Sequence, residues 1–152
     1  AYLAAHIRSG MHIVGAFHMD GTLAAATILT DPTNKTAQLG EFPVRNLKTK
    51  VIVFQSFMID PEHQGKGLSH ILDNMAKDLY PFADFMAKIA TDNQNSLESF
   101  IGRREFEIIA EVDSLDVRNN IPYRAVFVFR ESLSILRPVC CDAAQADVVL
   151  KA

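Results

Sequence analysis

One short segment, residues 60–69 (DPEHQGKGLS), has the residue types and spacing of an anion-binding turn. Gly65 and Gly67 let the backbone bend tightly and place no Cβ in the way of a ligand. The segment follows the apolar run Val51–Ile59 and precedes an amphipathic run ending at Tyr80, which predicts strand, turn and helix. The free N–H groups and the dipole at a helix start favour a bound anion. A ligand with a phosphate group is therefore the first hypothesis.

Two common phosphate-binding motifs do not fit this turn. A P-loop places Lys and Ser or Thr directly after its second glycine, whereas here Lys66 precedes Gly67 and Leu68 separates Gly67 from Ser69. The dinucleotide fingerprint requires three glycines in the first turn of a βαβ unit, and this turn has two. A nucleotide-binding domain is thus the weakest of the alternatives.

Residues 64–69 read Gln-Gly-Lys-Gly-Leu-Ser. This resembles the pyrophosphate loop of the GNAT superfamily of acyl-CoA-dependent N-acetyltransferases, which reads Gln or Arg, two residues, Gly, one residue, then Gly or Ala. Ser69 departs from the last position, but serine is small, so we expect an equally close approach of the ligand. Residues 59–62 also resemble the exit of the family's strand into this loop.

The first half of the chain predicts a hairpin and a buried strand. Met11–Met19 and Thr22–Thr30 are strand-like runs joined by Asp20-Gly21, which predicts a hairpin with a type I′ turn. Residues 31–50 are polar and predict a loop, and Val51–Ile59 predicts a central strand buried on both faces. The helix that follows carries apolar residues at one-face spacing, namely Leu68, Ile71, Leu72, Met75, Ala76 and Leu79.

The second half of the chain predicts a parallel strand, a short helix and two late strands. Phe85–Thr91 is the parallel strand. Asn95 is predicted as the N-cap of the second helix, with Glu98 completing a capping box. Glu107–Asp116 and Tyr123–Phe129 are the two late strands, and residues 131–152 form a tail of unknown role.

This element order predicts one α/β (α+β) domain over residues 1–152, with a GNAT-like mixed central sheet flanked by helices. The resemblance covers residues 12–129, so the N-terminal strand and helices of the family are expected to be shortened or missing. A net charge of −3 without a basic block disfavours nucleic acid, and no apolar run is long enough to span a membrane. The adjacent Cys140 and Cys141 favour a reducing, cytoplasmic location.

The resemblance implies acetyl-CoA as a co-substrate and no metal. It also implies that the buried strand carries a bulge and diverges from the next strand. The pantetheine arm would lie in that gap, along the end of the buried strand, and the pyrophosphate would meet the glycine loop. The residues implied to bind acetyl-CoA are Phe57, Met58, Ile59, Gln64, Gly65, Lys66, Gly67, Leu68, Ser69 and Asn95.

The catalytic groups of the family are not matched in this sequence. Many members place a Tyr on the second helix as the acid for the leaving thiolate, whereas this chain has Phe100 and Ile101 there. Many place a Glu on the buried strand as the base, whereas this chain has Gln55. The remaining candidates for acid–base roles are Glu41, Gln55, Ser56 and Ser99. The competing interpretation is that Glu41 is a solvated loop charge. Gln55 and Ser56 would then be polar residues that are hydrogen-bonded within the sheet.

The cationic residues have structural interpretations beside the functional ones. Arg103 and Arg104 end the second helix, where cations suit the helix dipole, and the CoA 3′-phosphate is the alternative partner. His12 and His18 would share one strand face, but no third metal ligand is indicated.

Two functions remain open from the sequence. The first is transfer of an acetyl group from acetyl-CoA to a primary amine, borne by a small molecule or a peptide. The second is a non-catalytic acyl-CoA binding or sensing domain on the same fold, which the missing Tyr and Glu motivate. A homodimer is left open as the assembly.

Overall fold

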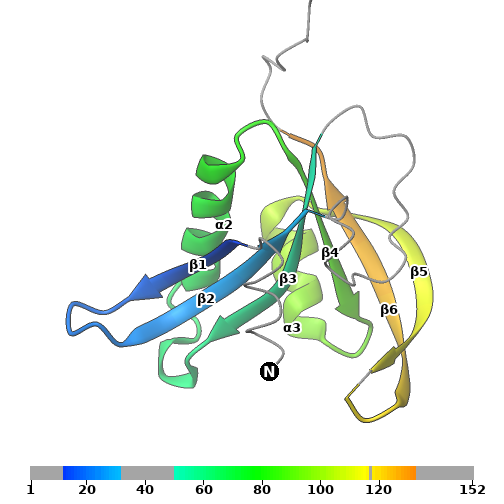
Figure 1. Cartoon of the computed structure of the whole chain (residues 1–152). Coiled ribbons are helices and arrows are strands. Elements are labelled where there is room, and N and C mark those ends of the chain that lie inside the picture. The colour runs from blue at the N-terminus through cyan, green and yellow to red at the C-terminus, as the bar shows by residue number, and fades with distance from the viewer. Residues whose placement is uncertain (1–11, 32–49, 117, 133–152) are drawn as a thin grey trace, which may run out of the picture.

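The computed structural model describes residues 12–31, 50–116 and 118–132 of the chain (Figure 1). Six strands form one sheet in the order β1-β2-β3-β4-β6-β5. All neighbouring strands are antiparallel except β3 and β4, which are parallel. The strands are β1 (His12–Phe17), β2 (Leu23–Thr30), β3 (Val51–Ile59), β4 (Asp84–Ala90), β5 (Glu107–Asp116) and β6 (Ile121–Arg130). The helices are the 3-10 turn η1 (Pro61–His63), α2 (Leu68–Leu79), α3 (Gln94–Leu97) and the π-helical turn η2 (Glu98–Gly102). The predicted mixed sheet with flanking helices is confirmed.

The β1–β2 hairpin forms as predicted, but the type I′ turn is wrong. Gly21 N–H donates to the carbonyl of His18 and His18 N–H donates to that of Thr22, both at 2.9 Å, which makes a three-residue loop. Gly21 has φ of 86°, whereas Asp20 does not reach positive φ. The reason is local, because the Asp20 carboxylate accepts hydrogen bonds from Thr22 N–H at 2.8 Å and Thr22 Oγ1 at 2.7 Å.

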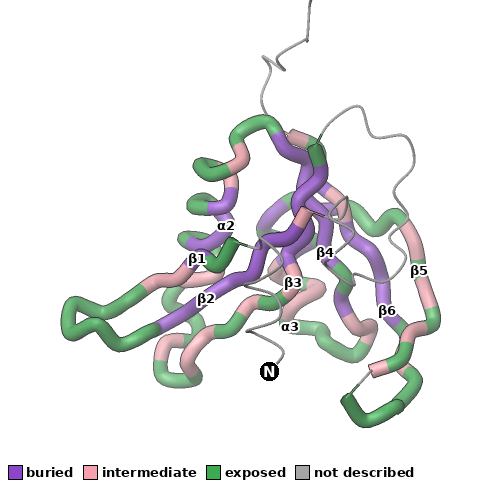
Figure 2. The backbone as a smooth tube through the Cα atoms, viewed as in Figure 1, coloured by how far each residue is buried: buried purple, intermediate pink, exposed green. Residues whose placement is uncertain are grey.

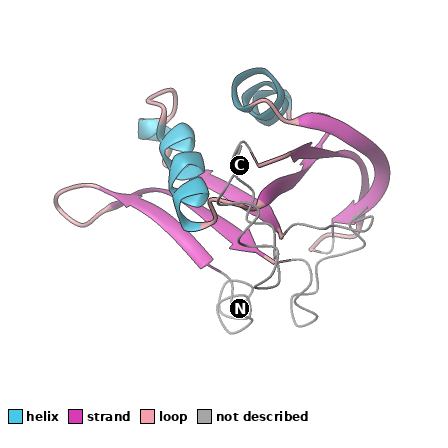
Figure 3. Cartoon of the chain, turned by 90° about the horizontal axis from the view of Figure 1, so that it is seen from above, coloured by secondary structure: helices cyan, strands magenta, loops and turns pink. Residues whose placement is uncertain are grey.

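Both helices lie on the same face of the sheet (Figure 3). The main core lies beneath them, and buried residues concentrate in the first halves of β3 and β4 and in the second half of β6 (Figure 2). Among its largest members are four phenylalanines from three parts of the chain, Phe54, Phe85, Phe100 and Phe106. In the described ranges no helix combines the length and apolarity needed to cross a bilayer.

Helix α2 buries a narrower stripe than its sequence predicts. Leu72 and Ala76 are fully buried against β1, β2 and β3, as is Asp73. The predicted core positions Ile71, Met75 and Leu79 are instead exposed, by 48%, 38% and 54%. The buried face of the helix is centred on positions 72, 73 and 76. The side chains at positions 71, 75 and 79 therefore lie at its edge.

The N-cap of the second helix is Asn93 and not Asn95. The Asn93 side chain accepts a hydrogen bond from Ser96 N–H at 3.1 Å. The capping box of Asn95 and Glu98 is therefore wrong, because the chain turns into the helix directly after β4 ends, two residues earlier than predicted. The predictions made for Glu41, for Cys140 and Cys141, and for the tail from residue 133 on lie outside the described residues.

Candidate functional site

The parallel strands β3 and β4 diverge along their length. They pair only from Val51 with Asp84 to Phe54 with Ala87. Beyond that point β3 continues along β2 to Ile59, whereas β4 continues along β6 to Ala90. The sheet therefore opens between the two strand ends, as Figure 1 shows, and the divergence that the family resemblance implied is confirmed.

A β-bulge at Gln55 sets which side chains face this opening. Ser56 pairs with Ile28 and Phe54 pairs with Leu29, so Gln55 is the extra residue on β3. Alternation alone would place Phe54 and Phe57 on opposite faces, but the bulge brings their rings to 5.0 Å on the helical face. The predicted bulge is confirmed, and it directs Phe57 toward the second helix.

A cavity of about 420 Å³ lies where the strand end, the glycine loop and the second helix meet. Seven of the predicted site residues line it, namely Phe57, Ile59, Gln64, Gly65, Ser69, Asn95 and Ser99. Five further residues complete the lining, namely Ser96, Glu98, Phe100, Arg103 and Arg104. The structure thus brings together residues from three elements that are up to 47 positions apart, from Phe57 to Arg104.

The remaining predicted site residues lie elsewhere. Met58, Lys66, Gly67 and Leu68 are not part of the cavity lining, although they adjoin residues that are. Gln55 donates a long hydrogen bond of 3.4 Å to Thr30 Oγ1, and Ser56 is exposed, with its carbonyl bonded to Thr27 Oγ1 at 2.7 Å. Neither side chain lines the cavity, which is evidence for their interpretation as sheet residues.

The glycine loop adopts a conformation that only glycine takes readily. Gly65 and Gly67 have φ of 76° and 77°, and a Cβ built on either meets no atom within 4 Å. Gly67 is the N-cap of α2 and no side chain caps that helix start. The N–H groups of Leu68 and Ser69 therefore remain available to an anion at the mouth of the cavity.

Arg104 is the residue of this site whose environment differs most from the sequence prediction. Its side chain is 5% exposed, and its guanidinium lies 4.5 Å from the ring centre of Phe57 and 4.6 Å from that of Phe100. Nη2 donates to Ser99 Oγ at 3.0 Å. Burial lowers the pKa of Arg104, and the nearby Asp73 partly offsets this. The i, i+4 spacing of Phe100 and Arg104 was the only sequence signal for this arrangement.

A second, shallower cavity of about 480 Å³ lies at the ends of β2 and β3. Its lining consists of Leu23, Ala24, Ala25, Ala26, Phe57, Met58, Ile59, Asp60 and Pro61. Phe57 and Ile59 belong to both cavities, so two ligands can contact the same strand end.

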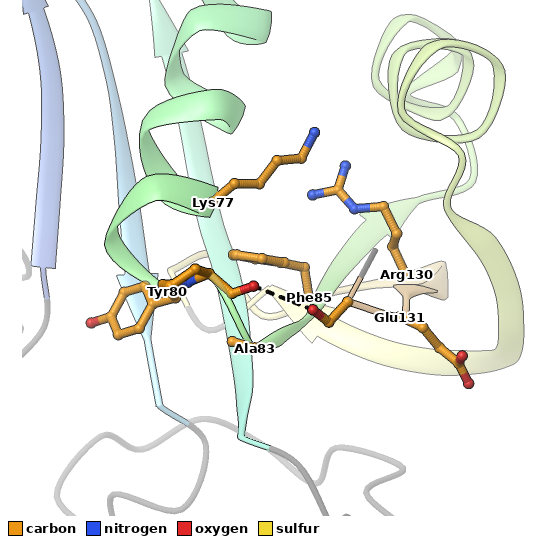
Figure 4. A pocket seen from close by; sticks show the side chains of 8 residues that line it. Lys77, Tyr80, Ala83, Phe85, Arg130 and Glu131 are labelled. Carbon is orange, nitrogen blue, oxygen red and sulfur yellow. Dashed lines mark hydrogen bonds between the residues drawn. The ribbon is translucent and has the colours of Figure 1, made fainter. Parts of the chain in front are cut away.

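A third cavity, of about 270 Å³, lies at the opposite end of the β3–β4 pair (Figure 4). Lys77 from α2 and Arg130 from β6 extend toward the same space. Both cations already contact the Asp73 carboxylate, at 3.2 Å and 3.0 Å. This region is therefore a structural ion cluster. In the described part of the chain no three His, Cys, Asp or Glu residues gather as metal ligands.

Comparison with known proteins identifies the fold. Neither protein-family models nor curated protein sequences gave a match to the chain. Among solved structures, yncA of Salmonella typhimurium with its cofactor acetyl-CoA matches with a TM-score of 0.62 and 17% identity, over 92% of this chain and 75% of that one. Naa50 of Arabidopsis thaliana, in complex with the bisubstrate analogue CoA-Ac-MVNAL, matches with a TM-score of 0.61 and 14% identity, over 86% and 79%.

A GNAT superfamily phosphinothricin acetyltransferase of Sinorhizobium meliloti, in complex with acetyl-CoA, matches with a TM-score of 0.58 and 15% identity, over 86% of this chain and 66% of that one. The chain therefore has the GNAT fold. At these identities the likeness shows the fold and leaves the activity to be argued from the site.

Proposed function

We propose that this chain is an N-acetyltransferase that transfers an acetyl group from acetyl-CoA to a primary amine. The observation that carries the proposal is the cavity where β3 and β4 diverge, bordered by the left-handed glycine loop. A ligand that fits it has an anionic end for the loop and a long, mostly apolar arm for the strand end. Acetyl-CoA has both, and the solved structures of similar fold include complexes with acetyl-CoA.

Each part of the site has a role toward acetyl-CoA in this proposal. The loop residues Gly65 to Ser69 would bind the pyrophosphate through backbone N–H groups, and Lys66 adds positive charge. Within the described ranges, the backbone of Phe57 to Ile59 pairs with no strand on the β4 side, so it would hydrogen-bond to the pantetheine arm as an added strand does. Asn95 and Ser99 line the opposite wall.

The acceptor amine would occupy the second cavity. That cavity shares Phe57 and Ile59 with the first, so an amine there can approach a thioester at the strand end. A backbone N–H near Met58 would stabilise the developing oxyanion. The proton of the attacking amine passes to water in this scheme, since Gln55 cannot titrate and Ser56 does not line the cavity.

A non-catalytic acyl-CoA binding domain is the second candidate. It is favoured by Phe100 and Ile101, which stand where many family members have the Tyr acid, and by the amide of Gln55 on β3. Phe100 is buried in the aromatic core, so its identity has a packing role.

Calorimetric titration with acetyl-CoA, with ATP as the control ligand, tests the step that both candidates share, which is the binding of acetyl-CoA. Acetyl-CoA binding in the micromolar range without ATP binding is the expected result. Thiol release is then followed across a panel of small amines and peptide N-termini. Release with one amine class supports the transferase, binding without release from any class supports the sensing domain, and no acetyl-CoA binding by folded protein contradicts both.

A further inference from the structure

Among the residues that the structure describes, two arginines are almost completely buried, and one of these two has a carboxylate partner there. Arg130 is 5% exposed and forms two 3.0 Å hydrogen bonds to the carboxylate of Asp73. Arg104 is equally buried but forms no ion pair within residues 12–31, 50–116 and 118–132. Its Nη1 is buried and has no hydrogen-bond partner there. Because burying an unpaired charge is unfavourable, this arrangement requires a reason.

The surroundings of Arg104 restrict what can approach it. The rings of Phe57 and Phe100 lie 4.5 Å and 4.6 Å from the guanidinium and contact each other at 5.5 Å, so both lie on one side of it and leave its other side for hydrogen bonding. Nη2 already donates to Ser99 Oγ. The unused Nη1 is therefore a single nitrogen with its N–H groups unpaired, and one nitrogen suits an anion centred on one atom. A phosphate or carboxylate would instead favour the two-pronged contact that Arg130 makes with Asp73.

The position of Arg104 identifies the part of the ligand that it would meet. It lines the same cavity as Gly65 and Ser69, but it packs on Phe57 at the strand end. In the proposed function, the anionic end of the ligand lies at the glycine loop and the thioester lies at the strand end. The charge that reaches Phe57 is then the one that develops on sulfur.

We propose that Arg104 is a catalytic residue that stabilises the thiolate of coenzyme A as it leaves. This rests on the proposed function and deepens it. The amine nitrogen forms a bond to the thioester carbonyl carbon, the carbon–sulfur bond breaks, and its electron pair stays on sulfur. The amine loses its proton to water, and Arg104 Nη1 donates a hydrogen bond to the sulfur while keeping its own proton. The thiolate is protonated by water after release.

This role accounts for the absence of a tyrosine on the second helix. A tyrosine acid would supply a proton to sulfur, whereas a guanidinium supplies a fixed positive charge and never needs to transfer one. The attraction between the guanidinium and a thiolate is strongest where water is excluded. The rings of Phe57 and Phe100 exclude water from one side of the guanidinium.

The test compares the affinity of coenzyme A with that of desulfo-coenzyme A between pH 6.5 and 9.5. A site that stabilises the thiolate lowers the pKa of the bound thiol below about 8.5, so coenzyme A gains affinity over the desulfo ligand as the pH rises. We expect a gain of about tenfold in that ratio, which corresponds to one pKa unit. The charged neighbours of Arg104 are Asp73, Arg130, Arg103 and Glu98, and they are the same in the wild type and in the Arg104 variants, so the difference between the two proteins reports Arg104.

Arg104→Gln should abolish the rise in the ratio while desulfo-coenzyme A still binds. Arg103→Gln is the matched control, because Arg103 lines the same cavity but is exposed and pairs with Glu98 at 3.6 Å. It should retain the rise. Arg104→Lys keeps a charge in the same place and should retain part of it, which a purely structural role of Arg104 would not predict.

The outcomes distinguish this inference from the function on which it rests. If the wild-type protein does not bind desulfo-coenzyme A, the proposed function fails and the inference fails with it. If both ligands bind the wild type with a ratio that does not change with pH, only the thiolate role is overturned. The pH dependence of the affinity ratio is measured on the wild-type protein. A folding defect in Arg104→Gln therefore cannot conceal the answer.

Discussion

Arg130 of β6 holds Asp73 of α2 in a two-pronged ion pair beneath the helix. Nη1 donates to Oδ2 and Nη2 to Oδ1, both at 3.0 Å, and Nη1 also donates to the Arg104 carbonyl at 3.1 Å. Lys77 contacts the same carboxylate from the next turn of α2 at 3.2 Å. The pair therefore connects α2, which packs on β1 to β3, with the strand on the far side of β4.

Replacing Asp73 should destabilise the fold strongly. Asp73→Asn leaves the buried Arg130 without its counter-charge, and we expect a loss of about 3–5 kcal/mol in the free energy of unfolding at pH 7. Chemical denaturation would measure this loss. Asp116→Asn is the control, because Asp116 forms a comparable pair with Arg118 at 3.0 Å but on the surface. That variant should leave the denaturation midpoint nearly unchanged.

The effect of Asp73 should also depend on pH in a defined direction. Burial raises the pKa of this carboxyl, but hydrogen bonds and charge from Arg130 outweigh it and lower the pKa below its ordinary value. A carboxyl with a lowered folded-state pKa contributes full stability above its unfolded pKa of about 3.9 and loses it as the pH falls through the folded value. The difference between wild type and Asp73→Asn should therefore shrink below about pH 4. A difference that stays constant down to pH 2 would contradict the assignment.

Gly67→Ala should weaken acetyl-CoA binding beyond its effect on stability. Gly67 and Gly21 both have positive φ, of 77° and 86°, and a Cβ on either meets nothing within 4 Å. Alanine at either position should therefore destabilise by a similar amount, about 1–2 kcal/mol. Only the methyl group at Gly67 would project into the space assigned to the pyrophosphate. We expect at least a tenfold loss of calorimetric affinity for Gly67→Ala and none for Gly21→Ala. Equal affinities would remove the loop from the binding site.

The order of the elements was predictable because it depends on local patterns. Val51–Ile59 is a mostly apolar run, interrupted only by Gln55 and Ser56, and the pair Gly65 and Gly67 marks the turn that follows. The N-cap residue of α3 was not predictable, since asparagine at position 93 or at position 95 can cap a helix equally well. The choice is fixed by Thr91, whose N–H still bonds to the carbonyl of Arg124 at 2.9 Å and so holds the chain to β6 up to that point.

The site itself depends on contacts between distant residues. The bulge at Gln55 has no glycine to mark it and arises from pairing with β2, so only the resemblance to a family predicted it. The packing of Arg104 against Phe57 and Phe100 needs that bulge as well, because without it Phe57 would face away from the second helix. A pattern read along one segment cannot contain such information.

Glu105→Gly should stabilise the protein. Glu105 follows Arg104 with φ of 61°, in the left-handed region that costs most residues about 1–2 kcal/mol. Glycine relieves this strain but loses more chain entropy on folding, so we expect a net gain of about 0.5–1 kcal/mol, or roughly 2 °C in the melting temperature. Asn120→Gly is the control, because Asn120 has φ of 58° but asparagine tolerates that conformation. It should change the melting temperature little. If Glu105→Gly melts below wild type, the side chain of Glu105 contributes more to stability than its backbone strain removes.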